Sequence, residues 1–221
     1  QLQPDAPVFC FSAAQLRERA KIFLDGFPGE VSFAVKYNSA PEVLKVLAET
    51  GIKIWDVASV HEMAMVNNVA KNQRFHYHNP VKSKREIADA HKLYKCERYA
   101  VDCREELAKI ADIVGRDRNI EIAVRFVLPR DRGSSVHDFS TKFGAPEHIC
   151  VELLQQVVAL GYTPLLTFHP GSKSKEPYTY VRHIEAAARI ANLANVPIAK
   201  LNVGGGFPSN YVLSTAPEPN V

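Results

Sequence analysis

Three groups of residues that could do chemistry each follow a short apolar stretch of the chain. Lys36 comes directly after residues 31–35, and His169 ends residues 165–169, with Ser172 close behind. A third group after residues 199–203 consists of Gly204, Gly205 and Gly206. A lysine amine removed from water readily forms a Schiff base with an aldehyde, and glycine-rich backbone presents N–H groups to a phosphate. Together these features point to pyridoxal phosphate, which needs a lysine, phosphate anchors and a group against its ring.

Each of these residues also has a simpler interpretation. Lys36 could end its strand in water, His169 could be structural and the glycines could form a flexible turn. Asp56, Asn79 and Arg125 also end apolar stretches. Asp56 either caps the next helix or orients another polar group, and Arg125 is unusual at such a place unless it is paired. If the strands are parallel, all these side chains meet at the carboxyl edge of one sheet.

Strand-like and helical stretches alternate along the chain. The pattern predicts strands over 31–35, 52–58, 74–79, 98–103, 121–127, 165–169 and 199–203. It predicts helices over 42–49, 83–95, 102–114, 146–160 and 178–193, and one more beginning at Ser59, where Glu62 completes a capping box. The second such box is Ser83 with Glu86, and Gly51 and Gly161 end two of the helices.

This alternation favours a parallel sheet with helical crossovers. The first strand is not followed by the glycine fingerprint of a dinucleotide-binding sheet, and the repeat length fits a barrel of about 250 residues. We therefore expect an α/β fold, a (β/α)8 TIM-type barrel that stops before its eighth strand. The prediction covers residues 1–221 as one domain.

Composition excludes several other classes of protein. The 221 residues are 46% hydrophobic and 23% charged, which excludes a disordered or coiled-coil chain. The net charge of +3 is too small for a nucleic-acid binder, and the densest basic cluster, residues 82–85, is expected to be a solvated loop or helix start. No apolar run is long enough to span a membrane, and residues 1–5 do not resemble a signal peptide. The four cysteines match no zinc pattern, so we expect no metal and a cytoplasmic location.

Six segments, in order along the chain, resemble motifs of the fold type III pyridoxal-phosphate decarboxylases, the family of ornithine, lysine and diaminopimelate decarboxylases with an alanine racemase-like barrel. They are F-A-V-K-Y-N at 33–38, W-D-V-A-S at 55–59, N-P-V-K-S at 79–83, K-F-G at 142–144, F-H-P-G-S at 168–172 and G-G-G-F-P at 204–208. No single motif is specific, but the set covers nearly the whole chain.

The resemblance implies a role for each candidate residue. Lys36 would hold the cofactor and His169 would stack on its ring, while Ser172 and the three glycines would bind its phosphate. Asp56 and Arg125 would line the site. The implied reaction is decarboxylation of a basic amino acid, and the N-P-V-K-S and D-V-A-S forms favour ornithine or lysine over diaminopimelate. Members of the family form homodimers and serve polyamine biosynthesis.

The sequence departs from the family in two ways. Pro170 stands where the family has valine, and it removes one N–H near the phosphate. The E-P-G-R segment and the C-terminal β-domain of the family have no counterpart, since Glu218 follows the glycines too closely to belong to that segment. We therefore expect these residues alone not to turn over substrate. A non-catalytic or regulatory pyridoxal-phosphate-binding homologue remains an alternative, and a phosphosugar-binding barrel would explain the glycines but not Lys36 with His169.

Overall fold

A computed structural model describes residues 5–129, 143–171 and 176–207 of the chain. Its elements alternate between strand and helix. In chain order they are α1 (Ala13–Gly26), β1 (Ser32–Ala34), the 3-10 turn η1 (Val35–Tyr37), α2 (Pro41–Thr50), β2 (Ile54–Val57), α3 (Val60–Val69), β3 (Arg74–Tyr77), α4 (Lys84–Tyr94), β4 (Arg98–Val101), α5 (Arg104–Val114), β5 (Glu121–Arg125), α6 (Glu147–Ala159), β6 (Thr163–Thr167), α7 (Tyr178–Ala194) and β7 (Lys200–Asn202).

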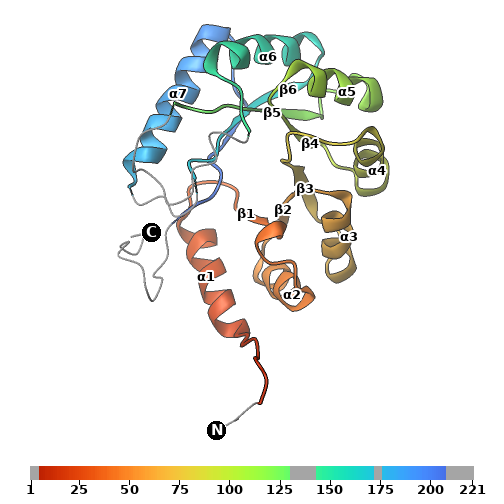
Figure 1. Ribbon diagram of the computed structural model, residues 1–221, viewed down its shortest axis with the longest axis vertical. Helices are drawn as coiled ribbons and strands as arrows, with labels where there is room; N and C mark the ends of the chain where they lie inside the picture. The colour runs from red at the N-terminus through yellow and green to blue at the C-terminus, as the bar shows by residue number, and fades with distance from the viewer. Residues whose placement is uncertain (1–4, 130–142, 172–175, 208–221) are drawn as a thin grey trace.

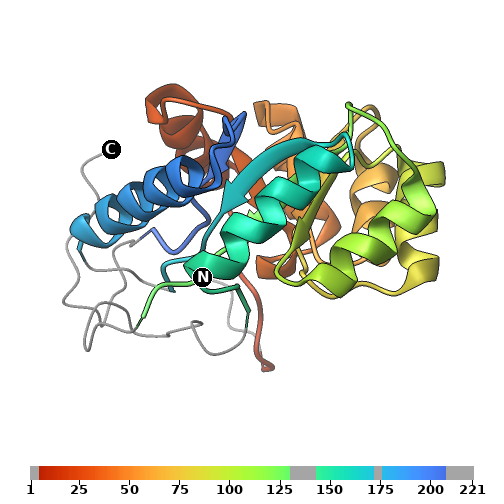
Figure 2. The same cartoon turned by 90° about the horizontal axis from the view of Figure 1, so that it is seen from above.

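The seven strands form one parallel sheet whose order follows the sequence, from β1 to β7. The sheet curls, and helices α2 to α7 lie on its outer side (Figures 1 and 2). This is the predicted truncated (β/α) barrel: all seven expected strands are present, and within the described residues no eighth strand joins β7 to β1. Several strands end earlier than predicted, by one residue in β1, β2 and β7 and by two in β3, β4, β5 and β6.

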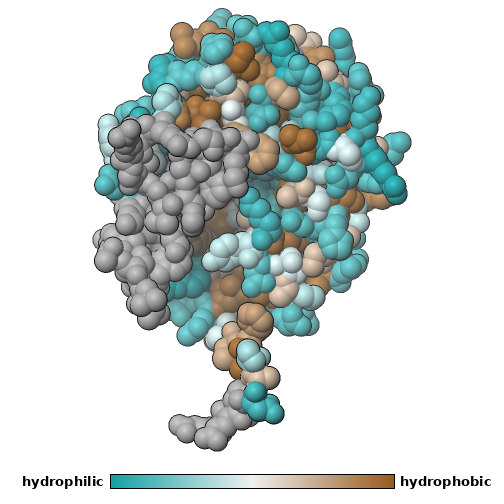
Figure 3. All heavy atoms as spheres, in the orientation of Figure 1, coloured by the Kyte–Doolittle hydropathy of each residue, from teal (hydrophilic) through white to brown (hydrophobic). Residues whose placement is uncertain are grey.

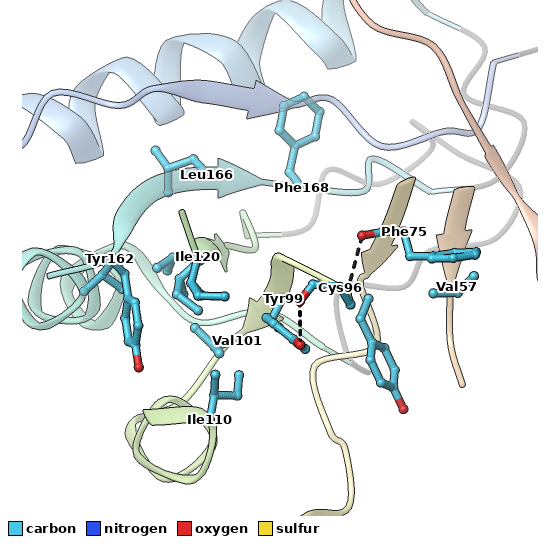
Figure 4. Packing of buried hydrophobic residues seen from close by; sticks show 14 of the residues in the cluster. Val57, Phe75, Cys96, Tyr99, Val101, Ile110, Ile120, Tyr162, Leu166 and Phe168 are labelled. Atoms are coloured by element: carbon cyan, nitrogen blue, oxygen red, sulfur yellow. Dashed lines mark hydrogen bonds between the residues drawn. The ribbon is translucent and has the colours of Figure 1, made fainter. Parts of the chain in front are cut away.

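The main core lies between the sheet and the helices. Alternate residues of each strand, such as Tyr99 and Val101 on β4, point outward into it and meet helix residues such as Ile110. Figure 4 shows this packing, with the Tyr99 hydroxyl donating to the Cys96 carbonyl at 2.8 Å and the Cys96 thiol to the Phe75 carbonyl at 3.4 Å. Burial of this apolar surface contributes most of the favourable free energy of folding.

Side-chain caps begin two of the helices as predicted. The Ser59 hydroxyl accepts the N–H of Glu62 at 3.3 Å, and the Ser83 hydroxyl accepts that of Glu86 at 3.1 Å. The Glu62 carboxylate reaches the Ala58 N–H at 2.7 Å, one residue before the one that a standard capping box uses.

Helix α1 was not predicted from the sequence. Ser12 caps it by accepting the Gln15 N–H at 3.3 Å. The helix buries little apolar surface, since Ala20 is its buried residue and Leu16 and Leu24 are partly covered. Its apolar periodicity in the sequence is correspondingly weak. The segment before it exposes apolar side chains, including Phe9. Figure 3 shows apolar surface at the lower end of the molecule, next to the grey atoms.

The basic cluster at residues 82–85 was interpreted incorrectly at one position. Lys84 and Arg85 are exposed as expected, but Lys82 is buried. Its ammonium lies 3.0 Å from the Glu106 carboxylate of α5. All four cysteines are free, and no helix of the described part of the chain is long and apolar enough to cross a membrane.

Candidate functional site

The inner, concave side of the sheet is polar, whereas the interior of a closed barrel is usually filled with layers of branched apolar residues. The buried apolar cluster on this side is small and consists of Ala100, Ala123 and Leu165. The two alanines leave space for larger neighbours. The polar side chains that fill it come from five strands or the residues next to them and are Asp56, His76, His78, Arg98, Glu121, Lys200 and Asn202.

Arg98, the first residue of β4, connects several polar side chains at the amino ends of the strands. Its guanidinium donates to Glu121 Oε2 at 2.5 Å and to His76 Nδ1 at 3.1 Å, and Glu121 also accepts from Lys200 at 2.8 Å. Because a guanidinium can only donate, Nδ1 of His76 is an acceptor and its proton is on Nε2. Burial lowers the pKa of His76, which keeps this ring neutral near pH 7.

A second group of polar side chains, nearer the carboxyl ends of the strands, consists of Asn202, His78 and Asp56. Asn202 Nδ2 lies 3.2 Å from His78 Nδ1, which lies 3.3 Å from Asp56 Oδ1. Burial lowers the pKa of His78 to about 4, so its ring is also neutral near pH 7. Burial favours the neutral acid at Asp56, whereas the positive charge of Arg98 favours the carboxylate, and the pKa of that carboxyl is lowered. The side-chain cap of α3 comes from Ser59 and not from Asp56, which lies beside the two imidazoles.

Asp56, His76 and His78 offer three ligand atoms within 4.8 Å of one another, a set that could hold a metal ion. Two observations argue against that use. Both imidazole Nδ1 atoms already face donors, from Asn202 and Arg98. Arg98 is also a permanent cation, which would repel a metal at His76. A hydrogen-bonded cluster explains the geometry better, and the absence of a resident metal stays a prediction.

Lys36, Arg125 and His169 gather at the carboxyl end of the strands. Burial, together with the charges of Arg125 and Lys36, lowers the pKa of His169 to about 4, so its ring is neutral near pH 7. His169 Nδ1 accepts the Gly171 N–H at 3.1 Å. Burial also lowers the pKa of Arg125, whose guanidinium lies 5.5 Å from the centre of the Phe143 ring. A neutral imidazole thus lies near two cationic side chains.

The expected desolvation of Lys36 is not found, because its side chain is exposed. Strand β1 ends at Ala34, and η1 then buries Val35 completely while it leaves Lys36 and Tyr37 on the surface. Asn79 also differs from expectation. Its side chain faces its own loop, where it lies 3.4 Å from the Val81 N–H.

The glycines after β7 need to be glycines at two positions. Gly204 has φ +71°, and a Cβ there would lie 2.4 Å from the carbonyl oxygen of Phe168. Gly206 has φ +88°, and its Cβ would lie 2.0 Å from the carbonyl oxygen of Gly171. The loop therefore packs directly on the segment that follows β6, and Tyr180 holds it by donating to the Gly205 carbonyl at 2.9 Å.

Two predicted residues, Ser172 and Lys142, lie outside the described residues. Sequence reasoning gave no role to His76, His78, Arg98 and Asn202. A usable signal was present in the strand F-H-Y-H, where alternate polar residues indicate that one face is not an apolar core.

The sequence matches the family described as pyridoxal-dependent decarboxylase, pyridoxal binding domain, over residues 13–219. A lysine/ornithine decarboxylase from Selenomonas ruminantium is 33% identical over 80% of this chain and 45% of that protein. An antizyme inhibitor 2 from Xenopus laevis is 32% identical over 84% of this chain and 41% of that protein. A crystal structure of an SrLDC mutant in complex with PLP has a TM-score of 0.79 at 29% identity, over 89% of this chain and 51% of the other. The chain spans about half or less of each relative's length.

Proposed function

Since the chain belongs to the pyridoxal-dependent decarboxylases and forms part of their pyridoxal-binding domain, we propose that it takes part in decarboxylating a basic amino acid, ornithine or lysine, to the corresponding diamine. One observation carries the assignment of the site. Lys36, His169 and the glycine loop, which lie far apart in the sequence, are positioned by the carboxyl ends of three strands of one parallel sheet. The ornithine or lysine preference is supported by the name of a relative, a lysine/ornithine decarboxylase.

The residues fit pyridoxal phosphate. Lys36 offers an accessible amine. Gly204 and Gly206 turn the loop at positive φ, and Gly205 between them has nothing within 4 Å of where a Cβ would lie, so a phosphate can approach the backbone there. When bound, the cofactor supplies an aldehyde and an electron-accepting ring.

The side chains around Lys36 and the glycine loop determine the charge of the proposed cofactor site. His169 is neutral near pH 7 because burial and two neighbouring cations lower its pKa to about 4, so it can lie flat against an aromatic ring without adding charge. Arg125, and Lys36 before it reacts, make the mouth cationic, which attracts a phosphate or a substrate carboxylate. Asp56 would lie behind this layer, beside His78.

A second candidate function has its own support, because a relative of nearly equal identity is named as an antizyme inhibitor. In that case the fold would serve regulation instead of catalysis. Release of CO2 from ornithine or lysine by the product of the complete reading frame distinguishes the two. We expect the 221 residues alone to release none, because the chain spans less than half of its curated relatives. The homodimer and the cytoplasmic location remain predictions.

The first test is covalent attachment of the cofactor at Lys36. We expect pyridoxal phosphate added to the chain to show the longer-wavelength absorption of an aldehyde attached to lysine, and borohydride to trap it on the peptide that contains Lys36. Lys36→Ala should lose both signals, whereas Lys53→Ala, at another exposed lysine, should keep them. Equal labelling of the parent and Lys36→Ala would refute the assignment.

A further inference from the structure

Asn202, the last residue of β7, connects the glycine loop to the polar interior. Its Oδ1 accepts the N–H of Gly204 at 2.7 Å, and its Nδ2 lies 3.2 Å from Nδ1 of His78. The orientation of this amide is fixed, because a backbone N–H can only donate and must face the oxygen. Nδ2 therefore donates to His78, which lies 124 positions earlier in the sequence.

His78 is suited to receive this hydrogen bond. With Nδ1 accepting from Asn202, the proton of the neutral ring is on Nε2. The ring is held by its position directly after β3 and stacks on His76 at a centroid distance of 5.5 Å. Asp56 Oδ1 lies 3.3 Å from His78 Nδ1 without a hydrogen bond to it, and Asp56 Oδ1 and His78 Nε2 are both buried with no hydrogen-bond partner among the described residues.

The hydrogen bond from the Gly204 N–H fixes the backbone conformation at the start of the glycine loop. The backbone at Gly204 turns at positive φ directly against the Phe168 carbonyl, so a small rotation there redirects the N–H groups that follow. Asn202 accepts the N–H of Gly204 itself, so the N–H groups available to a phosphate would be those that come after it.

We propose that Asn202, held in place by His78, is a positioning residue that sets the glycine loop to receive a phosphate. The proposal rests on the proposed function and goes beyond it, because it assigns a role to two residues that do not touch the cofactor. It predicts that disturbing this pair weakens recognition of the phosphate and spares attachment of the aldehyde at Lys36.

The test compares pyridoxal phosphate with 5-deoxypyridoxal, which has the aldehyde but no phosphate. Absorption titration gives a dissociation constant for each ligand with the parent, Asn202→Leu and His78→Leu. Loss of one neutral hydrogen bond corresponds to roughly a 10-fold change in affinity. We expect about that loss for pyridoxal phosphate in both variants, with the constant for 5-deoxypyridoxal changed less than about 3-fold.

Two further variants complete the design. His78→Gln supplies an amide oxygen that can accept from Asn202 and should restore most of the affinity for pyridoxal phosphate. Asn192→Leu makes the same substitution at an exposed position of α7 and should leave both constants unchanged. Circular dichroism and thermal unfolding show whether each variant folds.

The outcomes distinguish failure of the proposed function from failure of the positioning role of Asn202 and His78. If the parent attaches neither aldehyde at Lys36, the proposed function fails. If the parent attaches both but Asn202→Leu and His78→Leu weaken both ligands equally, the pair only stabilises the fold and the positioning role is wrong. Unchanged affinity for pyridoxal phosphate in folded variants would also overturn it, and so would failure of His78→Gln to recover affinity that His78→Leu has lost.

Discussion

Lys82 and Glu106 form an ion pair that is almost completely removed from water, with side-chain exposures of 0% and 4%. The Lys82 ammonium uses all three of its donors, on Glu106 Oε1 at 3.0 Å, the Asn79 carbonyl at 2.9 Å and the Ala100 carbonyl at 2.7 Å. Glu106 has a second cation, Lys109, at 2.5 Å. The two members of the pair are therefore not equivalent, because only the carboxylate has a replacement partner.

This asymmetry predicts an order of stabilities. Glu106→Gln leaves the Lys82 cation buried with two carbonyls and no counter-ion, and breaking a buried pair in this way costs about 3–5 kcal/mol of unfolding free energy. Lys82→Met removes the buried cation and leaves Glu106 neutralised by Lys109, so we expect a smaller loss, about 2 kcal/mol, from the unpaired carbonyls. The double variant Lys82→Met/Glu106→Leu should be more stable than Glu106→Gln, because apolar replacements of a buried pair are often neutral.

Urea unfolding at pH 7, followed by fluorescence and circular dichroism, measures these free energies if the two transitions coincide. Lys45→Met, at an exposed position of α2, is the matched control and should change the free energy by less than about 0.5 kcal/mol. The reasoning is refuted if Lys82→Met is as destabilising as Glu106→Gln, or if the double variant is the least stable of the three.

Two other predictions concern the loop and the histidines. Gly204→Ala should lose affinity for pyridoxal phosphate and unfold at lower urea, because its Cβ would lie 2.4 Å from a carbonyl oxygen at φ +71°; Gly115→Ala, at φ +73° with nothing within 4 Å, is the control for backbone strain alone. Burial lowers the pKa of His78 to about 4, so between pH 4 and an unfolded value of about 6.5 the unfolded chain binds more protons than the native one. Unfolding free energy should then fall as pH decreases through this window, by at most about 1.4 kcal/mol per unit from this residue. His78→Gln should flatten the dependence, and an unchanged slope would contradict the assignment.

Local patterns in the sequence are sufficient to predict the order and number of the strands. Ser59 and Ser83 mark helix starts through hydrogen bonds made within three residues, so the signal is complete in the sequence itself. The grouping of Lys36, Arg125 and His169 follows equally directly, since parallel strands bring their carboxyl ends to one edge.

Contacts between distant residues are where the sequence interpretation fails. The burial of Lys82, in the loop before α4, depends on Glu106, which is 24 residues away on α5. Nothing in a run of four basic and polar residues indicates that partner. The exposure of Lys36 depends on a single 3-10 turn, which the apolar stretch before it does not reveal. Helix α1 was missed because it buries little, so its apolar periodicity is faint.

The buried polar side chains on the inner side of the sheet lower the stability of the fold, whereas the apolar outer core raises it. Buried polar groups are destabilising unless they are hydrogen-bonded, and Asp56 Oδ1 and His78 Nε2 are buried with no hydrogen-bond partner among the described residues. Apolar residues at these positions would not carry that penalty. Because the outer core already holds strands and helices together, the stability of this part of the barrel does not require the cluster. The groups instead lie directly behind the loop and the mouth where a charged cofactor would bind, and positioning that ligand is the use that accounts for their cost.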